Sequence, residues 1–406
     1  SVPKQASSSH LFLLTARNQT VLQTVAQQLR EHLLNHPEQN LAEVAFTLNN
    51  TQREFSDKTA FVVSDRQHLL GALAEVANNI ENPDFYKGRS NPKRQLTLSL
   101  FVEGSAALTP QEVETVASEF PSFQVAYQDC QTLWKDYSLN RQPEQPLTEK
   151  AHGFAVQYAL LKWLQSLEIQ PTYLLAEDIG ILVAACLTGR LTLEEAIAAL
   201  ARLEGEKMVI PFQRTSQEES IQTWNCPLIT PKGTFKTATT LSSLQLSALV
   251  QSSESLHPQH YQDLIKSGGI CLSLGNRQHQ ETDLTWIVPN PQQTSVTRLL
   301  TLMAQLYVVG VRFNSRGLFS LGTGRVPLPT YPFEHKSYQA EVVCVSDATV
   351  LTPNVDCKPS SSTAIKSVSR PEFDQDLLPS EQLPSLSREQ RRSSSLALAK
   401  ELKRLS

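Results

Sequence analysis

The sequence predicts an α/β fold spread over two or three domains and followed by a disordered tail. Apolar runs typical of strands alternate with amphipathic helical patterns from residue 10 to about residue 311, which is the arrangement of α/β proteins. The chain has 406 residues, 40% of them hydrophobic, so it is long enough to build more than one packed core. Residues 346–406 are rich in Ser and Pro and poor in aromatic residues, which predicts disorder, although leucines near the end are spaced to allow a short helix.

Residues 1–95 are expected to form a small α/β module without catalytic residues. "HLFLLTA" has the composition of a buried strand, and the helix after it carries apolar residues at helical spacing. A later helix can be capped by Ser64 or Asp65, with Gln67 as the capping-box partner of Ser64. The polar, turn-rich segment 82–95 is expected to be a linker. The predicted elements are a strand at 10–16, a helix at 18–36, a short helix at 41–49, a strand at 59–64 and a helix from about 66.

Residues 96–314 form a second predicted unit, and residues 315–345 form an extended, proline-rich segment after it. The pattern between 205 and 291 is weak, with short strands, polar loops and one helix near "HPQHYQDLIKSGG". The clearer elements are a strand at 96–104, a helix at 150–169, a strand at 171–175, a helix from about Ile179, a helix at 192–203 and a helix at 294–311 that runs into a strand.

"LLAEDIG" (174–180) has the strand–turn–helix pattern of a nucleophile elbow, a sharp turn that exposes a catalytic nucleophile. The small residues Ala176 and Gly180 flank the turn, as close packing of strand and helix requires. Asp178 stands at the tip, where such turns usually carry serine. The stretch therefore predicts either an unusual nucleophile or an elbow without its usual chemistry.

Composition argues against several classes of function. A net charge of −4 gives no reason to expect a nucleic-acid or anionic-membrane partner. The six cysteines form no CxxC pair, so we expect free thiols in a reducing cytoplasm and no metal site or other cofactor. No apolar run approaches the ~18–20 residues of a membrane span. The chain enters a strand soon after Ser1, so we expect it to be part of a longer polypeptide.

Four segments together resemble the linker, acyltransferase and post-acyltransferase region of a modular polyketide synthase. Residues 10–80 are similar to the adaptor between ketosynthase and acyltransferase, and "MAQLYVVGVRFN" (303–314) to the end of the acyltransferase. "VPLPTYPFEHKSY" (326–338) is similar to the proline-rich tail that wraps back over the adaptor. Residues 157–197 resemble the segment around the acyltransferase motif GHSxGE. The resemblance covers roughly residues 10–340, with the motifs in the family's order.

The resemblance implies an α/β-hydrolase-like core that carries a ferredoxin-like subdomain. In the family, the elbow serine takes an acyl group from coenzyme A and passes it to a carrier-protein thiol. A histidine activates that serine, and backbone N–H groups stabilise the oxyanion. An arginine binds the carboxylate of malonyl-type units.

The sequence departs from each of these features. The motif GHSxGE aligns with residues 176–181, and only Gly180 matches. Leu203 stands at the arginine position, and the adjacent Arg202 would point about 100° away on a helix. The loop "FVEGSAAL" lacks the family's glutamine, no histidine occurs between His152 and His257, and most of the ferredoxin-like subdomain is expected to be missing. The degenerate elbow thus consists of Ala176, Glu177, Asp178, Ile179, Gly180 and Ile181.

The expected function is therefore structural, with no catalytic activity in this region, in a modular polyketide synthase or a polyketide–peptide hybrid. The implied partners are the ketosynthase of the same polypeptide, which would make the assembly a homodimer, an acyl carrier protein and a trans-acting acyltransferase. Alternatively, the module performs no extension at all. The residues expected to pack the tail on the adaptor are Pro329, Tyr331, Pro332 and Phe333.

The alternative is an α/β-hydrolase-like enzyme that uses Asp178 as its nucleophile. "AEDIG" fits the small–x–nucleophile–x–small pattern, but such an enzyme also needs a histidine and a covered pocket. The candidate histidines are His257, His260, His279 and His335, each of which is also explained as a solvated loop residue.

Overall fold

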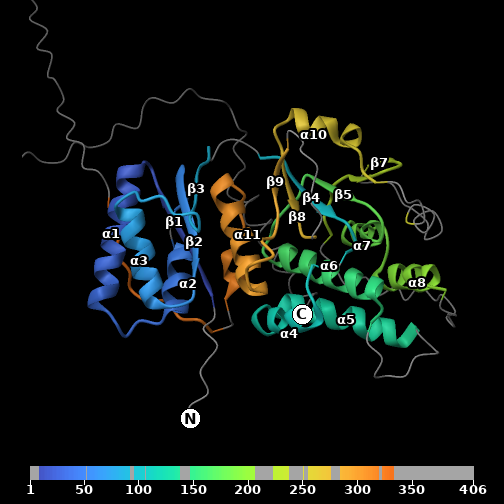
Figure 1. The fold of residues 1–406 in the computed structure, drawn as a ribbon, viewed down its shortest axis with the longest axis horizontal. Helices are drawn as coiled ribbons and strands as arrows, with labels where there is room; N and C mark the ends of the chain where they lie inside the picture. The colour runs from blue at the N-terminus through green and yellow to red at the C-terminus, as the bar shows by residue number, and fades with distance from the viewer. Residues whose placement is uncertain are drawn as a thin grey trace, which may run out of the picture. The chain divides into compact units, whose positions relative to one another are not determined.

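Two sheets organise the chain, as Figure 1 shows. The computed structural model describes residues 9–51, 53–91, 96–105, 107–137, 147–205, 223–236, 250, 255–275, 284–319 and 322–332. A three-stranded sheet has the order β1-β2-β3, and a six-stranded sheet has the order β7-β6-β5-β4-β8-β9. The predicted α/β class is confirmed. The predicted disordered tail and terminal helix (346–406) lie outside the described residues.

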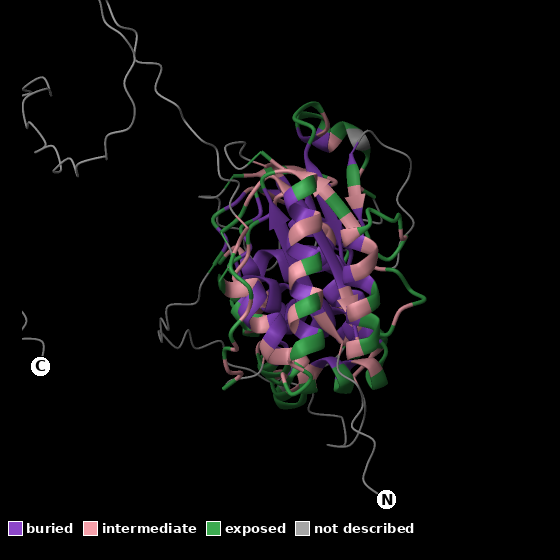
Figure 2. Cartoon of the chain, turned by 90° about the vertical axis from the view of Figure 1, so that its left-hand side faces the viewer, coloured by how far each residue is buried: buried purple, intermediate pink, exposed green. Residues whose placement is uncertain are grey.

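The three-stranded sheet is antiparallel and consists of β1 (His10–Ala16), β2 (Asp57–Val63) and β3 (Tyr86–Arg89). Helices α1 (Gln19–Asn35), α2 (Leu41–Thr51) and α3 (Arg66–Ala77) cover one face, and their apolar residues form one core with Phe12 and Phe61, whose rings stack at 5.9 Å. Figure 2 views this helical side and shows exposed and intermediate residues on the outward helix faces, with buried residues behind them. Strands β1 and β2 are buried on both faces, which explains their continuous apolar runs.

Two expectations for this module were wrong. The expected linker 82–95 contains β3, an edge strand whose residues alternate between half-buried and exposed and therefore look polar in sequence. A Cβ at Gly88 would collide with the carbonyl oxygen of Val308, so only glycine allows β3 to lie this close to the helix beside it. Helix α3 is capped by Asp65, whose carboxylate accepts from the His68 N–H at 2.8 Å, and not by a Ser64–Gln67 capping box.

The six-stranded sheet is parallel except for its edge strand β7. Helices α4 to α8 pack on one face, and the short helices η1 (Pro258–Tyr261) and α10 (Gln262–Lys266) pack on the other, through Tyr261 and Leu264. The strands are β4 (Leu98–Val102), β5 (Tyr173–Ala176), β6 (Leu228–Thr230), β7 (Gly233–Phe235), β8 (Ile270–Ser273) and β9 (Thr285–Ile287). The helices are α4 (Pro110–Glu119), α5 (Pro121–Tyr137), α6 (Glu149–Ser166), α7 (Gly180–Leu187) and α8 (Leu193–Leu203).

The part of the chain that would carry a ferredoxin-like subdomain is short. Helix α8 ends at Leu203 and β6 begins at Leu228, directly beside β5 in the sheet. The described residues contain no third sheet. Residues 206–222 lie outside the described residues, so the expected loss of most of that subdomain stays a prediction.

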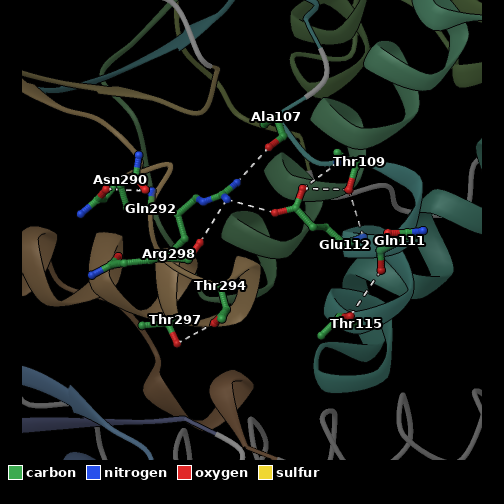
Figure 3. Close-up of polar contacts among 11 residues, drawn as sticks. Ala107, Thr109, Gln111, Glu112, Thr115, Asn290, Gln292, Thr294, Thr297 and Arg298 are labelled. Carbon is green, nitrogen blue, oxygen red and sulfur yellow. Dashed lines mark hydrogen bonds and ion pairs between the residues drawn. The ribbon is translucent and has the colours of Figure 1, made fainter.

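Helix α11 (Ser295–Val309) packs against all three strands of the first sheet and also touches α4. Figure 3 shows how Arg298 joins α11 to the start of α4: its guanidinium donates to the Ala107 carbonyl oxygen (3.2 Å) and to the Glu112 carboxylate (3.0 Å). It also donates to the Gln293 carbonyl oxygen (3.2 Å), just before α11. The predicted helix at 294–311 is confirmed. The strand expected after it is absent, because residues 311–314 pair with no sheet and Asn314 N–H donates to Leu167 O instead.

Candidate functional site

The elbow predicted at residues 174–180 exists as a backbone structure. Strand β5 ends at Ala176 and helix α7 begins at Gly180. Between them, Asp178 has φ +49°, in the left-handed region, and its side chain is exposed. Asp tolerates this conformation better than most residues do. The turn therefore presents a carboxylate at the position where an elbow presents its nucleophile.

Glycine is required where the elbow crosses the loop that follows β4. A Cβ at Gly180 would collide with the carbonyl oxygen of Val102, and Gly104, at φ +75°, lies against the backbone of Gly180. The Glu177 N–H donates to the same Val102 oxygen at 3.1 Å. Ile179 and Ile181 are buried beneath the turn. The elbow thus keeps the close strand–helix packing that an exposed nucleophile needs.

A buried glutamine fixes the loop that follows β4. The Gln157 amide oxygen accepts from the Gly104 N–H at 3.0 Å, and its amide nitrogen donates to Ser105 O at 2.8 Å. In an elbow enzyme, one oxyanion donor is the N–H after the nucleophile and the second is an N–H of such a neighbouring loop. In this chain the Gly104 N–H already donates to the Gln157 amide oxygen, so it is not free to bind an oxyanion. Sequence reasoning missed Gln157, although a glutamine within the apolar helix α6 is a recognisable signal.

Glu177 connects the elbow to residues 255–261. Its carboxylate is buried and accepts from the Leu256 N–H at 2.8 Å. His257, directly after Leu256, is exposed, and its Nδ1 accepts from the Gln259 N–H at 3.4 Å. The His260 Nδ1 accepts from the His257 N–H at 3.0 Å. Two of the candidate histidines therefore lie in the segment that contacts the elbow, and both have their Nδ1 atoms engaged in capping.

Three further histidines named in the sequence analysis are not part of this segment. His152 lies on α6, where its Nδ1 is 3.1 Å from the Tyr127 hydroxyl and its Nε2 is 2.9 Å from Leu108 O, so both ring nitrogens serve packing of α4, α5 and α6. His279 and His335 lie outside the described residues. Within the described ranges, no three His, Cys, Asp or Glu side chains are grouped to share a metal ion.

The predicted arginine position, Leu203, lies at the end of helix α8. Leu203 is partly buried and packs against the main core, and Arg202 is exposed. Neither side chain provides a buried cation that could bind the carboxylate of a malonyl group.

The buried thiols are poor candidate nucleophiles. Burial raises the pKa of Cys130, Cys186 and Cys271, and it raises the pKa of Cys226 to about 11. The thiolate is the nucleophilic form, so these four groups are unreactive near neutral pH. Cys344 and Cys357 lie outside the described residues.

The proline-rich tail lies on the first module. The Tyr331 hydroxyl accepts from the Arg17 N–H at 3.1 Å, and its ring lies 4.7 Å from the Phe55 ring. Val326 N–H donates to the Thr47 hydroxyl at 3.0 Å, and Pro327 O accepts from the Gln39 amide at 3.2 Å. Of the expected packing residues, Tyr331 and Pro332 are partly buried, Pro329 is exposed, and Phe333 lies outside the described residues.

Comparisons with known proteins agree with this architecture. The family model "CurL-like, PKS C-terminal" (PKS, polyketide synthase) matches residues 10–73. The acyltransferase domain of ZmaA has the same fold with a TM-score of 0.62 at 14% identity, covering 80% of this chain and 100% of that domain. The acyltransferase domain from module 8 of the salinomycin polyketide synthase gives a TM-score of 0.57 at 14% identity, covering 78% and 98%. This chain therefore has a fold similar to that of acyltransferase domains from modular polyketide synthases.

Curated polyketide synthases also match this acyltransferase-like region. It is 25% identical over 235 residues to polyketide synthase GfsA of Streptomyces halstedii, covering 52% of this chain and 3% of that protein. It is 25% identical over 360 residues to the spectinabilin polyketide synthase system protein NorC of Streptomyces orinoci, covering 82% and 16%. The chain thus spans a small part of these multidomain relatives. None of the helices in its described ranges combines the length and apolar character that a membrane crossing requires.

Proposed function

We propose that this acyltransferase-like region is catalytically silent and serves as a scaffold in a polyketide synthase. The observation that carries the proposal is the elbow itself, whose backbone is intact while Asp178 occupies the nucleophile position. A carboxylate has no hydroxyl to form the acyl ester that acyltransferases pass to a carrier protein. In this proposal the chain keeps the acyltransferase fold but cannot carry out acyl transfer.

Three further features support silence. The Gly104 N–H, in the loop that would supply the second oxyanion donor, is bound by Gln157. Leu203 replaces the arginine that would bind a malonyl carboxylate. The described histidines near the elbow use their Nδ1 atoms in backbone capping. Restoring one group would therefore leave the others missing.

The scaffolding role rests on the first module and its tail. At least three hydrogen bonds and one ring contact hold the tail on the module, so the tail and the module form one continuous, ordered surface. We propose that this surface positions the ketosynthase of the same polypeptide and an acyl carrier protein. The same region would dock a trans-acting acyltransferase that supplies the missing activity.

Docking can be tested with a free-standing malonyl-coenzyme A:carrier-protein acyltransferase from the same biosynthetic system. We expect a saturable complex in isothermal titration calorimetry. Loading of the carrier protein should also be faster when this region is present than when an unrelated protein of equal size replaces it. Absence of both effects would refute docking while leaving catalytic silence in place.

A second candidate keeps Asp178 as a working nucleophile. The specific observation in its favour is that Asp178 is exposed and held at φ +49°, the conformation of an elbow nucleophile. Attack of its carboxylate on a thioester carbonyl would expel the thiol and leave a mixed anhydride. A base such as His257 would then have to activate water. Turnover of acyl thioesters to free acid, abolished by Asp178→Asn, would favour this candidate.

A further inference from the structure

The first module and the tail enclose a groove that lies away from the elbow. Its volume is about 430 Å³. Its floor is apolar, with Val25 and Leu29 from α1 and Leu48 from α2 all buried. The remaining lining residues come from the segments beside these helices and from the tail: Arg17, Gln28, Thr47, Thr51, Arg53, Phe55, Leu328, Pro329, Thr330, Tyr331 and Pro332.

The tail wall of this groove is fixed by specific contacts. The Tyr331 hydroxyl is bound to the Arg17 N–H, and the Tyr331 ring packs on Phe55. Upstream, Val326 and Pro327 are hydrogen-bonded to α2 and to the loop before it. The wall is therefore preformed, and a ligand would not have to order it. Preformed, mostly apolar cavities of about 300–1,000 Å³ are typical of small-molecule sites.

The charged side chains that line the groove are all positive among the described residues. Two arginines contribute, and no Asp or Glu does. The Arg17 guanidinium lies 5.7 Å from the centre of the Phe55 ring, which holds it beside the apolar floor. Arg53 is exposed, and none of the ion pairs among the described residues includes it. The groove thus combines apolar surface with two cations that have no carboxylate partner in its lining.

We propose that this groove binds a small molecule with an apolar body and a terminal carboxylate, such as a medium-chain acyl acid. The body would cover the floor formed by Val25, Leu29 and Leu48. The carboxylate would face Arg17 and Arg53, because a guanidinium matches a carboxylate in charge and geometry. An amine of the same shape would meet two like charges. This proposal does not depend on whether the elbow is active.

The first test titrates the complete chain with hexanoate, octanoate and decanoate, using isothermal titration calorimetry. Each added methylene should tighten binding by roughly fourfold, until the groove is full. Octylamine, which has the same chain with a positive head, should bind at least about tenfold more weakly than octanoate. Equal affinity for octylamine, no dependence on chain length, or no binding of octanoate would overturn the proposal.

Variants locate the site. Arg17→Gln and Arg53→Gln should each weaken octanoate binding several-fold, and Gln28→Trp, which fills the groove, should abolish it. Arg202→Gln is the matched control, since Arg202 is exposed on α8 and does not line the groove. Thermal unfolding checks that each variant is folded. Equal binding by all four variants would overturn the proposal, as would sedimentation showing that a second copy of the chain fills the groove.

Discussion

At the scale of single residues, the elbow has the backbone geometry of a nucleophile turn but carries Asp178 where serine is expected. The turn still needs a residue that accepts φ +49° and a glycine that passes close to Val102, and Asp178 and Gly180 meet these needs. The sequence could predict both, because small residues around a strand–helix turn are a local pattern. It could not predict that Gln157 binds the Gly104 N–H, because 53 positions separate the two residues in the chain.

Replacing Asp178 by serine should not restore acyl transfer. The new hydroxyl would lack an activating histidine, a free oxyanion donor at Gly104 and an arginine at position 203. We expect no acyl-enzyme with malonyl-coenzyme A, as measured by intact-protein mass spectrometry. Asp178→Asn is the matched control for the change in charge. A stable acyl ester on the new serine would show that the remaining machinery is competent.

Gly180→Ala should lower the free energy of unfolding by about 1–3 kcal/mol. The added methyl group would collide with the Val102 carbonyl oxygen, so strand β4 and helix α7 would have to move apart. Gly71→Ala is the control, because a Cβ at this position in α3 meets nothing within 4 Å. It should stabilise the protein by roughly 0.5–1 kcal/mol through helix propensity. Urea unfolding of both variants measures the contrast.

At the scale of elements, long periodic segments were predictable and short or edge elements were not. Helices α1, α6, α8 and α11 follow from their apolar spacing. Strand β3 lies in a segment that the sequence predicts to be a linker, because this edge strand has no buried apolar run. Helices α4 and α5 have no counterpart among the predicted elements, although Thr109, Pro110 and Glu112 form a helix-start pattern. Strands β6, β7 and β9 have three residues each, too few for a periodic signal.

The contact between α4 and α11 should make stability depend on pH. Burial acts to raise the pKa of Glu112, but hydrogen bonds from Thr109 and the charge of Arg298 outweigh it and lower that pKa. A carboxylate with a lowered pKa stabilises the fold above its unfolded pKa, about 4.3, and this contribution disappears as the pH falls below that value. Glu112→Gln should therefore lose stability near pH 7 and show a smaller further loss on acidification. Parallel urea titrations at pH 7 and pH 3.5 measure this, and an unchanged pH dependence would contradict it.

Packing of the tail should depend on Tyr331. Tyr331→Ala removes the Phe55 ring contact and the hydroxyl that accepts from the Arg17 N–H, so we expect a loss of about 1–2 kcal/mol in unfolding free energy. Tyr331→Phe keeps the ring and should lose about 0.5–1 kcal/mol. Pro329→Ala, at an exposed position, is the control for this segment. If Tyr331→Ala and Pro329→Ala unfold at the same urea concentration, the ring contact contributes nothing.

At the scale of the whole molecule, the chain has an acyltransferase-like fold, and we propose that its catalytic function is lost. The six-stranded sheet, its helices and the elbow are present, and the match to the ZmaA acyltransferase domain covers 80% of this chain. Only residues 204–227 connect α8 to β6, where the sequence comparison with the family places the ferredoxin-like subdomain. Meanwhile, the first module keeps a complete core and a tightly bound tail. This division fits the scaffolding role that we propose, because the module that would bind partners is well packed.

Intact-protein mass spectrometry after incubation with malonyl- and acetyl-coenzyme A tests catalytic silence most directly. The account predicts no added mass on this chain and no transfer to a carrier protein, while an active acyltransferase assayed in parallel becomes acylated. A stable adduct that maps to Asp178 would contradict it, and would mean that the elbow carries out a chemistry based on its carboxylate.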